Sequence, residues 1–345
     1  MCAFDNAALL WDQMRHASLR EMKQRLILFF VTAPFWIWGI FSFLYGSLDR
    51  TSSLTLAAIY GLWHVSCFFR KKFLSAALGI AIAGLLPLFG FFFLMQPSQF
   101  RDWQADVSEL PHAIFSNNSV TVYNVRNCAY TSPSNYTPRF ETRTYDLNAL
   151  RTLDVLSVDW GLHAIAHTLV SFGFADGQYL CFSAEARKKK GDTYSAIRGF
   201  FRQYELIYVA GDERDLIRLR TNFRSNEVTR LYPITKAKPE LIKAMFTGYI
   251  ERINALHARP EWYNAFSQNC MAGFVDLLKQ EAVPGYTQWH WSSLLTGYAA
   301  HHAYTIGALD QTQPFDVIQK QAIINDKARK AHDAVDFSQR IRASD

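Results

Sequence analysis

Two residues far apart in the chain could form a thiol–imidazole pair, Cys270 and His167. A cysteine thiolate is a strong nucleophile, and a histidine can remove the thiol proton and return it to a leaving group near neutral pH. Cys270 follows Asn269, a good helix N-cap residue, and the apolar spacing after it is helical. We therefore expect the thiol on the first turn of a helix, where the dipole favours a thiolate. The backbone N–H of Cys270, with Gln268 and Asn269, is predicted to bind an oxyanion.

A β-hairpin is predicted to position the histidine. Two strand-like runs, His167–Phe174 and Tyr179–Ala186, flank the turn residues Asp176 and Gly177. A turn centred on Asp176 places Glu185 opposite His167. The predicted role of Glu185 is therefore to orient the imidazole.

The remaining elements surround this hairpin. Ser119–Tyr130 alternates like a strand, and Pro239–Leu256 has helical apolar spacing after a proline in its first turn. A second helix begins near Cys270 and stops at Pro284. A buried, unreactive thiol is the plain alternative for this cysteine. No cofactor motif is present, and His163 with His167 lacks a third ligand at a fitting spacing, so neither a cofactor nor a metal is expected.

The N-terminal part of the chain carries the membrane signals. Half of the 345 residues are hydrophobic. Three apolar runs without Asp, Glu, Lys or Arg lie near the start of the chain, at Leu26–Leu48, Ser53–Phe69 and Phe73–Met95. A span needs about 20 apolar residues. Basic residues at Arg15–Arg25 and Arg70–Lys72 predict that both of these segments are cytoplasmic. Three crossings then place the main domain outside the cytoplasm, whereas two crossings would leave it inside.

Charge and composition divide the rest of the chain. With 36 basic and 30 acidic residues the net charge is +6, and most of the excess lies beside the apolar runs, so a nucleic-acid partner is not expected. The predicted organisation is a cytoplasmic segment (1–25), a transmembrane region (26–96, with helices at about 26–48, 53–69 and 73–95), a linker (97–119), a main domain (120–312) and a solvated helical tail (313–345).

Three segments resemble one known family. They read DWGLHAIAHTLVSFGF, SAIRGFFRQYELIYVAGDERDLIRLRT and EWYNAFSQNC, and together they resemble the Lnb N-terminal periplasmic domain family over roughly residues 120–285. That family is similar to permuted papain-like thiol enzymes of the NlpC and lecithin–retinol acyltransferase type, in which the His strand precedes the Cys helix. The resemblance implies an α+β domain with an antiparallel sheet and packed helices, with His167 and Cys270 at the family's His and Cys positions.

The expected function follows from these observations. We expect a multi-pass protein of the bacterial inner membrane whose periplasmic domain is a thiol hydrolase or acyltransferase. Its expected substrates are an ester or amide of a membrane lipid or lipoprotein, because Lnb itself is implicated in lipoprotein N-acylation. Two alternatives remain: a cell-wall peptide amidase or peptidase with the same Cys–His dyad, and a non-catalytic envelope scaffold.

Overall fold

The computed structural model describes residues 2–46, 49–69, 84, 89–90, 94–265, 270–281, 283–285 and 290–343. The chain divides into two compact units, Met1–Gln96 and Pro97–Asp345. Each unit is described by itself below.

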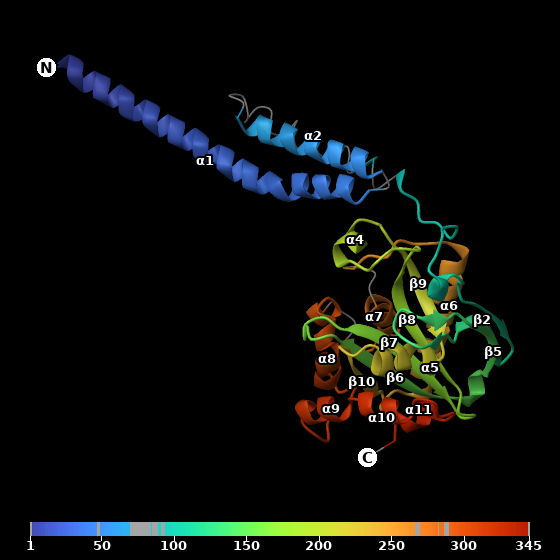
Figure 1. The fold of residues 1–345 in the computed structure, drawn as a ribbon. Coiled ribbons are helices and arrows are strands. Elements are labelled where there is room, and N and C mark those ends of the chain that lie inside the picture. The colour runs from blue at the N-terminus through green and yellow to red at the C-terminus, as the bar shows by residue number, and fades with distance from the viewer. Residues whose placement is uncertain are drawn as a thin grey trace. The chain divides into compact units, whose positions relative to one another are not determined.

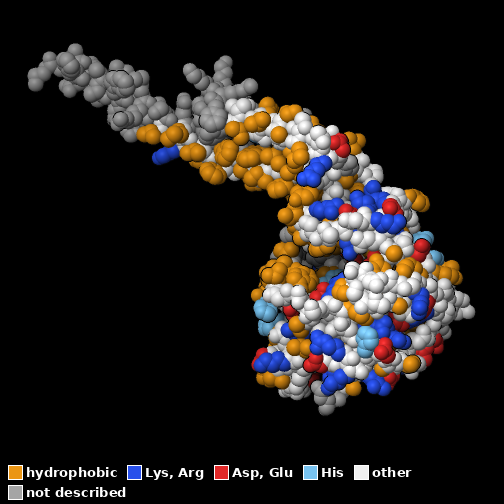
Figure 2. Space-filling model, viewed as in Figure 1, with side chains coloured by type: hydrophobic (Ala, Val, Ile, Leu, Met, Phe, Trp, Pro, Cys, Tyr) orange, Lys and Arg blue, Asp and Glu red, His pale blue; other side chains and the backbone are white. Residues whose placement is uncertain are grey.

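The first unit contains two long helices, α1 (Cys2–Leu44) and α2 (Arg50–Phe69), which pack against each other. Their described surface is covered mainly with hydrophobic side chains (Figure 2). Among the described residues, one segment is long and apolar enough to cross a membrane, Met22–Leu44 within α1. The expectation of three spans is therefore corrected to one candidate span in the described part. The second expected span is helical as α2, and most of the third, 73–95, lies outside the described residues.

The second unit is an α+β fold built on a mixed, mainly antiparallel eight-stranded sheet (Figure 1). The strand order is β1-β2-β9-β8-β7-β6-β10, and β5 pairs with β2 beside this path. The strands are β1 (His112–Ser116), β2 (Ser119–Arg126), β5 (Phe140–Asp146), β6 (Leu150–Asp159), β7 (His167–Phe174), β8 (Tyr179–Arg187), β9 (Glu205–Gly211) and β10 (Val228–Pro233). A separate two-stranded sheet pairs β3 (Ala129–Tyr130) with β4 (Tyr136–Thr137). Only the β2–β9 contact is parallel among the pairings of the described strands.

The central hairpin of this sheet is the one that the Asp-Gly turn predicts. Strands β7 and β8 pair antiparallel with Leu169 opposite Ser183 and Phe172 opposite Leu180. Gly177 adopts a positive φ of 85°, which glycine allows without steric strain. The predicted register is therefore confirmed.

Side chains alternate along β7 between two hydrophobic cores. Val170 and Phe172 pack into one core with Phe246 and Tyr249 of α6 (Pro239–Ala258). Leu169 packs into the other core on the opposite face of the sheet. This alternation follows from the two-residue period of a strand, and it decides on which face each candidate site residue lies.

The helices cover both faces of the sheet. Besides α6 they are α4 (Ala196–Phe200), α5 (Glu213–Arg218), α7 (Ala272–Gln280), α8 (Ala299–Thr305), α9 (Phe315–Gln321), α10 (Asn325–Lys330) and α11 (Phe337–Arg340), with short turns η1 (Ala105–Val107), η2 (Leu147–Ala149), η4 (Trp291–Ser293) and η5 (Thr296–Tyr298) and a π-helical turn η3 (Leu219–Phe223). Helices α6 and α7 pack on the first core. The second core includes residues of α5 and of the C-terminal helices.

Both segments that flank the expected domain are part of the second unit. Residues 97–119 contain η1 and β1, and the backbone of Gln104 bonds to that of Lys188. In the C-terminal segment 313–345, Phe337 and Ile341 are at most 1% exposed. These helices, red in Figure 1, lie beside β6 and β10, where Ile323 forms a bridge to Arg230. The tail is thus packed rather than solvated.

Candidate functional site

The histidine lies in a hydrogen-bonded relay on β7 and β8. The Nε2 atom of His167 is 2.7 Å from the hydroxyl oxygen of Ser183. That hydroxyl in turn donates to Oε1 of Glu185 over 2.8 Å. Glu185 is 4.0 Å from the imidazole, so the structure connects the two predicted residues through a serine that the sequence reasoning missed.

A buried arginine fixes the charge of this relay. Arg220, on η3, donates to Oε1 of Glu185 over 3.0 Å and to the carbonyl of Leu216 over 2.7 Å. Burial alone would raise the pKa of Glu185, but the guanidinium of Arg220, followed by Arg126, holds that pKa well below its usual range. Glu185 is therefore a carboxylate at every physiological pH.

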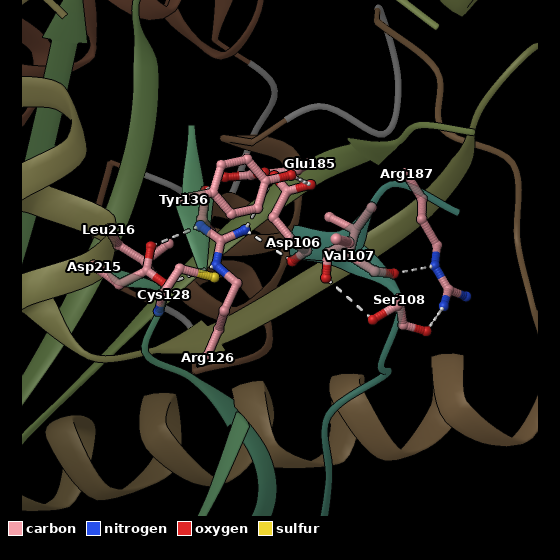
Figure 3. Close-up of polar contacts among 12 residues, drawn as sticks. Asp106, Val107, Ser108, Arg126, Cys128, Tyr136, Glu185, Arg187, Asp215 and Leu216 are labelled. Atoms are coloured by element: carbon pink, nitrogen blue, oxygen red, sulfur yellow. Dashed lines mark hydrogen bonds and ion pairs between the residues drawn. The ribbon is translucent and has the colours of Figure 1, made fainter. Parts of the chain in front are cut away.

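A second buried ion pair, between Arg126 and Asp215, lies near Glu185 (Figure 3). Arg126 of β2 makes two hydrogen bonds to Asp215, at 3.0 and 3.1 Å, and both side chains are at most 2% exposed. Asp215 also accepts the backbone N–H of Cys128 over 2.7 Å, so the carboxylate is multiply satisfied. Figure 3 draws Glu185 near the same arginine, whose charge contributes to the low pKa of that carboxyl group. Charged groups at this depth are retained only when they are paired in this way.

The protonation state of the imidazole follows from these contacts. Burial, and then the positive charges of Arg220 and Arg224, lower the pKa of His167 to about 3 although Glu185 opposes the shift. The ring is therefore neutral at neutral pH. Because the Ser183 hydroxyl donates its hydrogen bond to Glu185, the Ser183 oxygen accepts a hydrogen bond from the Nε2–H of His167. The unprotonated, basic nitrogen of the ring is then Nδ1.

The thiol lies on the other side of β7. Cys270 precedes α7 by two residues and packs against the core that α6 and α7 cover. Its sulfur is 3.8 Å from the carbonyl oxygen of Ala166, directly before His167. Ser183 and the imidazole instead share the face of Leu169 and Cys181. Within the described residues, the Cys270 sulfur and the His167 ring make no hydrogen bond with each other.

The environment of the sulfur favours the neutral thiol in the resting protein. Burial raises the pKa of Cys270, while hydrogen bonds from the backbone and side chain of Thr168 act against that shift. The cysteine lies in a turn before the helix rather than on its first turn, so the expected lowering of the thiol pKa is not found. Thr168 is thus a residue that would stabilise a thiolate once one forms, and it too was missed from the sequence.

Close backbone approach explains why small residues stand near the thiol. A Cβ atom at Gly273, in the first turn of α7, would lie 1.7 Å from the hydroxyl of Tyr208 on β9. A Cβ atom at Gly297 would lie 2.0 Å from the carbonyl oxygen of His163. Only glycine permits these contacts. Through them α7 and η5 are held against the β-strand ends beside Cys270.

An apolar cavity lies near Cys270, which is not itself one of its lining residues. Its volume is about 220 Å³, and its walls include Thr168, Met271, Phe274 and Thr296 together with alanines of α8. The first two of these residues adjoin the sulfur, because Thr168 hydrogen-bonds to it and Met271 follows it in the chain. The site therefore offers a hydrophobic compartment next to a nucleophilic atom.

The family of the chain is settled by one comparison. The family model described as the Lnb N-terminal periplasmic domain matches residues 136–312, more than half of the 345-residue chain. The chain belongs to the Lnb N-terminal periplasmic domain family. No curated protein and no solved structure matches it.

The family match covers the relay and the candidate nucleophile. The matched range 136–312 of the Lnb N-terminal periplasmic domain contains His167, Ser183, Glu185, Arg220 and Cys270. The family match and the candidate span Met22–Leu44 together indicate a membrane-associated periplasmic protein.

Other predicted residues fall outside the relay. Gln268 and Asn269, predicted to bind an oxyanion, lie outside the described residues. His163 lies in the exposed β6–β7 loop. In the described part of the chain, no group of three or more His, Cys, Asp or Glu side chains could hold a metal ion.

Proposed function

We propose that this protein is a membrane-anchored periplasmic thiol enzyme that cleaves or transfers the acyl group of a membrane lipid or lipoprotein. The observation that carries the proposal is the apolar cavity whose walls include Thr168 and Met271, the two neighbours of Cys270. A cavity of roughly 150 Å³ takes up benzene, so about 220 Å³ suits an acyl segment of roughly nine carbons. A peptide substrate would gain little from such walls.

The proposed reaction uses the residues of the site in turn. His167 Nδ1 accepts the thiol proton as the sulfur attacks the acyl carbonyl, and the ester or amide bond breaks as the imidazolium returns the proton to the leaving group. Water or an amine then releases the acyl group from the thioester. The Ser183–Glu185 pair stabilises the imidazolium, and the Cys270 N–H, with Gln268 and Asn269, is the proposed oxyanion site.

The sulfur of Cys270 and the ring of His167 must come closer together for this reaction than they are in the resting structure. His167 is the first residue of β7, so its ring stands where the strand begins and the thiol stands at the carbonyl before it. Catalytic hydrogen bonds are often long or absent until a substrate is bound. Because the sulfur and the ring lie on opposite sides of β7, the proposal requires the segment before His167 to move so that Nδ1 can reach the thiol when the acyl carbonyl is bound. A permuted papain-like arrangement and a location in the inner membrane belong to the same proposal.

The test is an acyl-transfer assay with the full chain in proteoliposomes. Phospholipid with a labelled acyl chain should leave a hydroxylamine-labile label on Cys270, and Cys270→Ser and His167→Ala should remove it. His163→Ala, in the exposed loop next to the site, is the matched control and should keep the label.

Chain length gives a second, sharper readout. Each buried CH₂ contributes about 0.8 kcal/mol, which is roughly a fourfold gain in kcat/KM. The gain should stop near nine carbons, and Ala303→Leu, which narrows the cavity, should move the plateau to shorter chains. Equal rates for all chain lengths would refute the acyl assignment of the cavity.

A non-catalytic scaffold is the second candidate. It is favoured by the absence, among the described residues, of a hydrogen bond between the sulfur of Cys270 and the ring of His167. A scaffold would show no labelled thioester, and its cellular phenotype would survive Cys270→Ser at an unchanged protein level.

A further inference from the structure

An exposed apolar patch lies at the end of the sheet that carries the candidate site. It combines the β6–β7 loop with η4 and η5, and we call it the aromatic rim. Its six members are each between 38% and 58% exposed. They are Trp160, Leu162, Ile165, Trp291, Leu295 and Tyr298.

The aromatic rim is one continuous surface. The backbone N–H of Gly297 bonds to the carbonyl of Ala164, and the Thr296 hydroxyl bonds to both backbone groups of Ala166. The rings of Trp291 and Tyr298 are 5.2 Å apart. In Figure 2 hydrophobic side chains gather beside a hollow, at the place where Figure 1 shows α8.

The chain enters the domain at this same end of the sheet. The end is formed where β6 finishes, β7 begins, β8 finishes and β9 begins. The backbone of Ser98 bonds to the carboxylate of Glu205, the first residue of β9, and Trp103 pairs with Lys189, just after β8. The segment that follows the membrane-associated part is therefore attached on the side of the aromatic rim.

The charges around this end favour a negatively charged surface. Residues 97–104 and 188–205 carry six basic and three acidic side chains. All three acids are paired with bases of the same segments, in the pairs Arg101–Glu205, Lys190–Asp102 and Arg198–Asp192. Lys188 and Lys189 make no ion pair with a described residue. The segment 290–306, which carries half of the rim, contains neither an acidic residue nor Lys or Arg.

We propose that the aromatic rim docks the domain onto the surface of the bilayer that anchors the chain. Tryptophan and tyrosine favour the membrane–water interface, where an apolar ring body and a polar edge are both satisfied. Apolar side chains then enter the boundary between headgroups and acyl chains, and the neighbouring lysines meet anionic headgroups. Docking in this orientation turns the thiol of Cys270 towards the lipid. The docking proposal itself does not depend on any chemistry at Cys270.

The test locates the domain on the membrane directly. The full chain is reconstituted in phosphatidylethanolamine–phosphatidylglycerol vesicles that contain a phospholipid with a photoreactive acyl chain. After irradiation, peptide mapping should find lipid adducts on residues 160–166 and 290–298. Leu162→Asp with Ile165→Asp should lower the adduct yield on those peptides at least tenfold. The matched control, Ile114→Asp with Phe115→Asp on β1, replaces side chains of similar exposure and should change nothing.

Three outcomes would overturn the proposal. Adducts confined to the membrane helices would show that the rim stays in water, and equal adducts on β1 would show non-specific contact. In native membranes, cross-links from the rim to a protein in place of lipid would assign the patch to a protein partner. Cys270→Ser should keep the rim adducts, so loss of the enzymatic proposal and loss of this one are distinguishable. Unchanged thermal unfolding of the double Asp variant shows that the fold is intact.

Discussion

The reactivity of Cys270 offers the sharpest check on the resting site. Burial raises the pKa of this thiol above its usual value, and the imidazole of His167 makes no hydrogen bond to it within the described residues. Because that pKa is raised above its usual value, only a small fraction of the thiol is ionised at pH 7. Alkylation by iodoacetamide, followed by peptide mass spectrometry from pH 5 to 10, should rise tenfold per pH unit through neutrality without a plateau.

Removal of the histidine should leave that profile almost unchanged. Burial and the nearby arginines lower the pKa of the His167 ring to about 3, so the ring is already neutral. It therefore carries no positive charge that could stabilise the thiolate. We therefore expect His167→Ala to shift the apparent pKa of Cys270 by less than about 0.5 units. A plateau below pH 7 that moves upward in this variant would reveal a resting thiolate–imidazolium pair, and the assignment of Nδ1 as a neutral base would be refuted.

Three further perturbations test the surroundings of the site. Arg220→Gln removes a positive charge beside the imidazole, so the pKa of His167 should rise by about one unit in an NMR titration; no change would show that burial acts alone. Arg342→Met leaves the buried carboxylate of Glu213 without its partner and should lower the free energy of unfolding by about 3–5 kcal/mol in a denaturant titration at pH 7. An unchanged free energy of unfolding would contradict the mechanism. Gly297→Ala forces a Cβ atom against a backbone carbonyl and should cost about 1–3 kcal/mol by the same assay, whereas an unchanged midpoint would mean that the loops can separate freely.

Local patterns explain which parts of the fold could be predicted. The Asp-Gly turn sets the β7–β8 register, so Glu185 could be placed beside His167 from the sequence alone. Helix α6 follows from its apolar spacing after Pro239. In both cases the signal lies within a few residues of the feature that it predicts.

The missed parts depend on contacts between distant segments. Arg220 reaches Glu185 from another element, 35 residues further along the chain, and no local pattern announces that contact. Ser183 could have been noticed, because it stands two residues before Glu185 on the same face of β8. The face on which Cys270 lies depends on how α7 packs, which periodicity does not determine. The buried tail was missed because its charged residues mask the spacing of Phe337 and Ile341.

The contacts of Arg342 bear on the order in which the domain folds. Its guanidinium bonds to Asp154 on β6 and to Glu213 at the start of α5, both at most 3% exposed, so two buried carboxylates are neutralised by a residue that follows every described strand in the chain. Before Arg342 packs against them during folding, Glu213 has the hydroxyl of Ser171 as a partner, but the two negative charges still lack this arginine. The interior of the domain thus carries uncompensated negative charge until Arg342 is in place. Proteases would meet a loosened fold in any chain without that contact and a closed fold once it has formed.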